Sequence, residues 1–252
     1  MEIPQHMHEY LFYGKVLPER APISMNFSAQ VIPLGEGAES TVTVNILLNQ
    51  IAAWVKTEKQ WDVLDLRNIV KTLVQNYLSM TGYLTGHAYD MEITRVICHQ
   101  LGVDYVFGID IPCVANRRVL PDIGAALNEL NKKTDHEHGV FLNRCFTDLT
   151  FAMKHADDTA FYCYRAIESL KNHCAAVNGL AEKGRDEQWK KFREISTCNE
   201  ATIRKIKIEA DQLRHGGDPH GTGANNEMIL SMTFSVVDSY IDNFQIPIPH
   251  QI

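Results

Sequence analysis

Two residue types that can act together on a phosphodiester lie close to the C-terminal end of the sequence. Five residues separate Arg214 from His220, and His215 follows the arginine directly. Arginine is always cationic and binds phosphate as a planar fork, whereas histidine exchanges a proton near neutral pH. Because the 2′-hydroxyl of RNA is itself a nucleophile, such a pair has only to position the phosphodiester, move protons and stabilise charge. The pattern predicts chemistry on RNA that requires no cofactor.

The arginine lies at the end of a predicted helix. Apolar residues recur every three or four positions from Ile203 to Leu213 and form one stripe. Arg204 and Lys207 fall on another face and are candidates for binding phosphate. Thr197 and Glu200 have the spacing of a capping box, which predicts the start of the helix, and a turn rich in glycine and proline follows it. The alternative is an ordinary basic helix followed by a turn, with no chemical role.

The charges of the chain are unevenly distributed. The net charge is −7, and residues 1–116 carry 7 basic and 12 acidic side chains. Residues 183–207 carry eight Lys or Arg against four Asp or Glu. This distribution excludes a general polyanion-binding surface but leaves one basic region that could meet phosphates. A solvated helix face would explain the same run of charge.

Composition also indicates in which cellular compartment the protein is expected and which partners it is not expected to have. No run approaches the roughly 18 apolar residues that span a bilayer, so no membrane partner is expected. The six cysteines form no C-x-x-C pair, which favours a reduced, cytoplasmic protein with free thiols. His6 with His8, and His136 with His138, are pairs spaced by two residues with no third ligand nearby. No metal site is therefore predicted.

Residues 1–112 are predicted to form a small α+β domain with antiparallel strands. The evidence is a set of alternating or β-branched segments around one segment of helical periodicity. It contains no phosphate-cradling glycine loop and no nucleophile elbow, so a role in regulation or docking is expected. The expected elements are strands over 10–16, 23–32, 41–48, 89–98 and 105–109 and a helix over 62–84.

Residues 113–252 are predicted to form an all-α domain. Apolar residues recur at helical spacing with short connections between segments, which indicates an antiparallel bundle. Asp158 is expected to cap the helix that follows it. The predicted helices cover residues 125–130, 140–153, 160–177, 186–195, 203–214 and 227–244.

Two stretches of this bundle resemble the HEPN superfamily of prokaryotic ribonucleases, toxins and defence proteins. AFYCYRAIESL, residues 160–170, is similar to the aromatic-rich early helix of that family. LRHGGDPHG, residues 213–221, is similar to its R-x(4–6)-H signature. The resemblance covers residues 140–244 and implies a helical bundle.

The resemblance also implies a function and a site. Active HEPN proteins are metal-independent endoribonucleases in which two copies of the chain form one cleft. Carried over, Arg214 would hold the scissile phosphate, His220 would transfer protons, and His215 would take the polar position after the arginine. Arg165 and Glu168 would line the cleft.

Two functions therefore stand open. One is a metal-independent endoribonuclease or RNA-directed effector in bacterial stress or phage defence, acting as a homodimer. The other is a non-catalytic HEPN-like binding or dimerisation module. The glycines and the proline between Arg214 and His220 depart from the family, in which that span is often helical, so whether the chain is an enzyme depends on how His220 faces Arg214.

Overall fold

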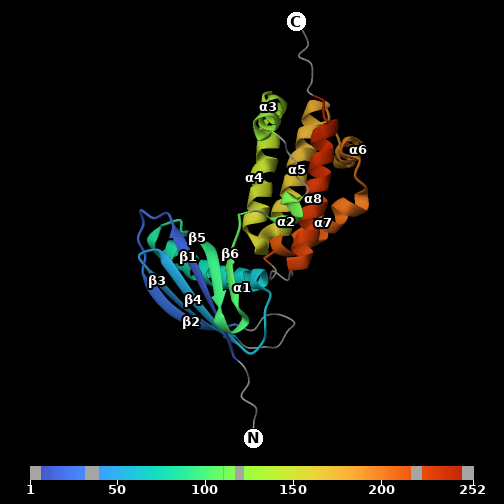
Figure 1. The fold of residues 1–252 in the computed structure, drawn as a ribbon. Coiled ribbons are helices and arrows are strands. Elements are labelled where there is room, and N and C mark those ends of the chain that lie inside the picture. The colour runs from blue at the N-terminus through green and yellow to red at the C-terminus, as the bar shows by residue number, and fades with distance from the viewer. Residues whose placement is uncertain (1–6, 32–39, 110, 117–121, 217–222, 246–252) are drawn as a thin grey trace. The chain divides into compact units, whose positions relative to one another are not determined.

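The chain folds into two compact units. The computed structural model divides into Met1–Ile109, which contains the sheet, and Asp110–Ile252, which contains a set of helices (Figure 1). Each unit has its own cluster of buried hydrophobic residues. The expected fold class is confirmed, since an antiparallel sheet is followed by a helical region. The structure describes residues 7–31, 40–109, 111–116, 122–216 and 223–245.

The described part of the first unit contains one six-stranded antiparallel sheet. Its strand order is β2-β3-β4-β1-β5-β6, so the first strand of the chain lies inside the sheet. Side chains alternate along β1, where Tyr10, Phe12 and Val16 are buried. The strands are β1 (His8–Leu17), β2 (Met25–Val31), β3 (Ser40–Leu47), β4 (Gln50–Thr57), β5 (Asp90–Cys98) and β6 (Val103–Val106).

The prediction of three strands before the helix is wrong, because the apolar run beyond Asn49 forms β4. Leu48 and Asn49 have φ values of 45° and 68° and close a two-residue hairpin between β3 and β4. The Asn49 side chain accepts a hydrogen bond from the Ile23 amide at 2.7 Å and donates one to the Val16 carbonyl at 3.2 Å. One buried amide therefore fixes this hairpin to the chain that precedes it.

Among the described residues of this unit, one α-helix, α1 (Val63–Thr85), packs on the sheet. Asp62 caps it, since its carboxylate accepts hydrogen bonds from the amides of Leu64 at 2.8 Å and Asp65 at 3.2 Å. A short 3₁₀ helix, η1 (His99–Leu101), joins β5 to β6. The buried residues of α1 are spaced by four positions and share one cluster with the sheet: Leu66, Val70, Val74 and Leu78.

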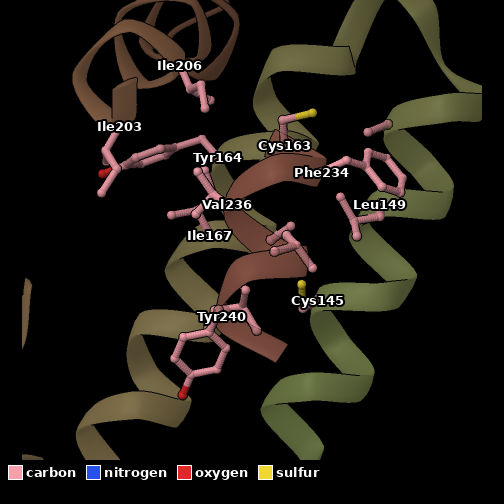
Figure 2. Packing of buried hydrophobic residues seen from close by; sticks show 14 of the residues in the cluster. Cys145, Leu149, Cys163, Tyr164, Ile167, Ile203, Ile206, Phe234, Val236 and Tyr240 are labelled. Atoms are coloured by element: carbon pink, nitrogen blue, oxygen red, sulfur yellow. The ribbon is translucent and has the colours of Figure 1, made fainter. Parts of the chain in front are cut away.

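The second unit is a helical bundle in which α5 is central. Figure 2 shows Ile167 of α5 and Val236 of α8 among the buried side chains between the helices. Contacts of α5 with α4, α6, α7 and α8 enclose it. The elements are α2 (Pro112–Ala115), α3 (Ile123–Thr134), α4 (Val140–Lys154), η2 (Ala156–Asp158), α5 (Thr159–Val177), α6 (Arg185–Ser196), α7 (Glu200–Arg214) and α8 (Gly223–Asn243).

Two predicted helix starts in this unit are corrected. The capping box of Thr197 and Glu200 is absent, because Thr197 has a φ of 50° and ends α6. Asn199 caps α7 instead, and its side chain accepts a hydrogen bond from the Thr202 amide at 2.8 Å. Asp158 does precede α5, but its side chain makes no capping hydrogen bond.

Hydrogen bonds place several helix ends together. Asn226, near the start of α8, donates to the Ala156 carbonyl in the turn between α4 and α5 at 2.8 Å. Asn225 donates to Glu209, in the second half of α7, at 3.2 Å. The end of α4 and the starts of α5 and α8 therefore share one end of the bundle, toward which α7 runs. At the other end of α8, Lys133 of α3 binds the Ile241 carbonyl.

Candidate functional site

A cluster of polar side chains lies where α5, α6 and α7 meet. Tyr164 of α5 is only 4% exposed, and Figure 2 shows its ring next to Ile203 of α7. The Tyr164 hydroxyl is hydrogen-bonded to Glu168, which also accepts from Arg185 at 3.2 Å. Burial, followed by the Glu168 charge, raises the pKa of Tyr164 to about 12. Tyr164 is therefore a neutral phenol at physiological pH and cannot serve as a base.

Lys207 and Asp211 of α7 continue this cluster toward the end of the helix. The Lys207 ammonium lies 5.9 Å from the centre of the Tyr164 ring and donates a hydrogen bond to the Asp211 carboxylate. That hydrogen bond is the main reason why the pKa of Asp211 is lowered, and the charges of Arg214 and His215 add to it. Lys207 is thus already partnered before any anion binds.

The exposed cations of α7 are Arg204, Lys205 and Arg214. Arg214 is the last residue of the helix, and the His215 amide closes the helix by donating to the Asp211 carbonyl at 3.2 Å. Neither arginine forms an ion pair with another residue of the described ranges. A phosphate group approaching the end of α7 would meet the Arg214 guanidinium group without first breaking a salt bridge.

The predicted site is only partly assembled by these elements. Glu168 and Lys207 fall within the polar cluster, and Arg214 and His215 adjoin it. His220 lies outside the described residues. The Arg214–His220 pairing therefore stays a prediction.

Arg165 lies apart from these residues. Its guanidinium group is paired at 2.9 Å with Asp148 of α4, whose side chain is 2% exposed. It also lies over two rings, 5.3 Å from the centre of Phe161 and 5.5 Å from that of Tyr162. Burial raises the pKa of Asp148, and Arg165 opposes that rise. Arg165 thus belongs to the surface that α5 shares with α4.

Sequence reasoning missed a buried chain of hydrogen bonds at the opposite end of the bundle. His173 is fully buried, with Nδ1 2.7 Å from the Tyr240 hydroxyl and Nε2 3.2 Å from Nε2 of His136. The His138 amide donates to Nδ1 of His136, so a neutral His136 donates through Nε2 to His173. The signal in the sequence is faint: His173 precedes Cys174 on the flank of the apolar stripe of α5.

The arrangement of the histidines, carboxylates and thiols bears on metal binding and on nucleophilic chemistry. No group of three such side chains within the described ranges is arranged to hold a metal ion. None of the six cysteines, which all lie in the described ranges, forms a disulfide. Burial raises the pKa of Cys163 to about 12 and that of Cys174 to about 11, so both remain neutral thiols. Within the described parts of the chain, no helix has the length and apolar character needed to span a membrane.

Family comparisons match both units. Residues 10–107 match the N-terminal domain, and residues 127–245 the C-terminal domain, of a family described as a domain of unknown function, DUF8168. The two domains occur in that order over most of the chain, which therefore belongs to the DUF8168 family. No curated protein and no solved structure matches the chain.

Proposed function

We propose that the C-terminal unit is a HEPN-like RNA-directed effector whose Arg214–His220 pair cleaves RNA without a metal ion. The observation that carries this proposal is the position of Arg214, an exposed cation on the last turn of α7 that no ion pair occupies among the described residues. Glu168 and Lys207 lie in the adjoining polar cluster. The proposed protein is a cytoplasmic homodimer, and RNA is its partner.

In this proposal each residue has its own role in cleavage. Arg214 binds the scissile phosphate and stabilises the charge that develops on it. His220 moves the proton between the 2′-hydroxyl and the leaving oxygen. Tyr164 and Lys207 act indirectly, since they hold Asp211 in place beside Arg214. His215 and Arg204 add positive charge along the path of the strand.

A cleavage assay tests this proposal. Arg214→Ala should lower the rate on single-stranded RNA about a hundredfold or more, and His220→Ala should be as severe if the two residues act as a unit. Lys132→Ala removes an equal charge from exposed α3 and should cleave like the wild type. Addition of EDTA should change nothing. Wild-type cleavage by His220→Ala, or activity lost to EDTA and restored by a divalent ion, would refute the proposed mechanism.

A non-catalytic RNA-binding module is the second candidate. It is favoured because three cations of the bundle already have a carboxylate partner, which leaves fewer of them to stabilise the charge that develops on a phosphate during cleavage: Arg185 with Glu168, Lys207 with Asp211, and Arg165 with Asp148. In that case the wild type would bind RNA without cleaving it. Arg214→Ala would weaken binding, and His220→Ala would leave it unchanged.

A further inference from the structure

Four aromatic side chains gather at the surface where α4 ends and α5 begins. We call Phe151, His155, Phe161 and Tyr162 the aromatic platform. Its ring centres lie 5.4 Å apart for Phe151 and Tyr162, and 5.2 Å apart for Phe161 and Tyr162. His155 lies 5.9 Å from Phe151. Phe151 is 38% exposed, and neither it nor Phe161 belongs to the buried core of the bundle. Tyr162 packs against the core, but packing of the core does not explain the positions of Phe151 and Phe161.

Arg165 is held at the edge of the platform in a fixed position. Its guanidinium group lies over Phe161 and Tyr162 and is anchored at 2.9 Å by the buried Asp148 carboxylate. The second carboxylate oxygen of Asp148 is buried and has no hydrogen-bond partner in the described residues. A guanidinium group has five N–H donors, and the side chain of Arg165 is 35% exposed, so donors remain for a ligand. Prior ordering of a long side chain lowers the entropic cost of binding.

The shape of this surface favours a nucleotide over a protein helix. The neighbouring solvent-facing residues of α4 are polar, namely Thr147, Thr150 and Lys154. An amphipathic helix requires an apolar groove several turns long, and that polar face offers none. A base needs one aromatic face, and its phosphate needs one planar cation. The platform and Arg165 provide this combination.

We propose that the aromatic platform and Arg165 form a subsite for one unpaired nucleotide of RNA. The base stacks on Phe151 and Tyr162, and the adjacent phosphate binds the free donors of Arg165. The turn that follows His155 is hydrogen-bonded to the start of α8. The platform therefore lies at the end of the bundle toward which α7 and Arg214 run. This inference rests on the proposed function, because it adds a requirement for unpaired bases to a protein that binds RNA.

The test is RNA binding by the full chain, measured by fluorescence anisotropy. The probe is a labelled 2′-O-methyl single strand, which the proposed reaction cannot cleave. The same sequence as a duplex and an abasic strand of equal charge are the comparison ligands. Phe151→Ala should weaken single-strand binding about tenfold without changing its salt dependence, since no charge is removed. Phe151→Tyr should restore it, and Val140→Ala, at the exposed start of α4, should bind like the wild type.

The outcomes separate this subsite from the proposed function. If the wild type binds all three ligands equally and Phe151→Ala changes none of them, the subsite is refuted while RNA binding stands. If the wild type binds none of them, the proposed function fails and the subsite fails with it. If Phe151→Ala dissociates a wild-type dimer in sedimentation, the platform is a contact between copies of the chain and the subsite is refuted.

Discussion

His173 is a buried imidazole that folding keeps neutral. Burial, followed by the charges that His136 and His138 would carry, lowers its pKa to about 4. In the unfolded chain the pKa of histidine is about 6.5. Between these values the unfolded chain binds the proton and the folded chain does not. The stability that His173 contributes is therefore fully present above about pH 6.5 and is lost as the pH falls toward 4.

We predict that the free energy of unfolding of the C-terminal unit falls by roughly 2 kcal/mol between pH 7 and pH 5 through this one group. His173→Asn, which cannot titrate, should lack that part of the pH dependence. Urea denaturation at both pH values measures it, with His215→Asn, an exposed histidine, as the control. An equal pH dependence in His173→Asn and the wild type would contradict the prediction.

The Asn49 amide provides a second test at the scale of one residue. It is 3% exposed and bonded to the backbone of Val16 and Ile23, while its own φ is 68°. Asn49→Gly tolerates the positive φ but loses the side-chain hydrogen bonds. Asn49→Ala loses these hydrogen bonds and in addition strains the backbone at this φ. We expect Asn49→Gly to lower the stability of the first unit by about 2 kcal/mol and Asn49→Ala by about a further 1 kcal/mol. Thermal unfolding of both variants measures this order. An equal loss of stability in the two variants would mean that a positive φ at this position does not destabilise alanine.

Among the helices, the start of α7 gives the clearest prediction. Asn199→Ala removes the cap that bonds the Thr202 amide and should cost about 1 kcal/mol. Glu200→Ala removes only an exposed partner of Arg193 at 3.7 Å and should cost less than about 0.5 kcal/mol. Chemical denaturation compares them directly. A larger loss of stability from Glu200→Ala than from Asn199→Ala would contradict the assignment of Asn199 as the cap and would favour the capping box of Thr197 and Glu200.

The elements that the sequence predicts well are those whose apolar pattern faces one core. The helix expected over 160–177 is α5, Thr159–Val177, and the one expected over 62–84 is α1, Val63–Thr85. The errors arise where one or two residues determine the backbone conformation. Asn49 turns the chain without the glycine that would have marked a hairpin, and Thr197 ends α6 at a positive φ.

The candidate site was harder to predict because its pairs form between helices. Nothing in the spacing of Arg165 shows that it faces Asp148, which lies 17 positions away in another helix. The same is true of His173 and Tyr240, separated by 67 positions. The cation at the end of α7 was found because helix periodicity and a following turn are local properties. The position of Arg214 relative to His220 depends on the conformation of the turn, which cannot be predicted from hydrophobic periodicity.

At the scale of the whole molecule, the two units have separate cores, and the basic run of the chain lies in the second unit. We predict that RNA binding belongs to the fragment 110–252, since residues 183–207 carry eight Lys or Arg against four Asp or Glu, whereas residues 1–109 carry 7 basic and 11 acidic side chains. Filter binding with each fragment measures it. Salt-sensitive retention of RNA by residues 1–109 would contradict this assignment, provided that circular dichroism shows both fragments to be folded.

The strand order of the sheet has a consequence for synthesis. β1 is made before its neighbours, yet it pairs with β4 on one side and with β5 on the other. Translation proceeds at about 5–20 residues per second, so roughly 4–16 s pass between completion of Leu17 and completion of Cys98. Throughout that interval Tyr10, Phe12 and Val16 cannot reach their final environment. The nascent chain exposes the centre of its future sheet until five of the six strands have been synthesised, which makes this segment the natural point of contact for a chaperone.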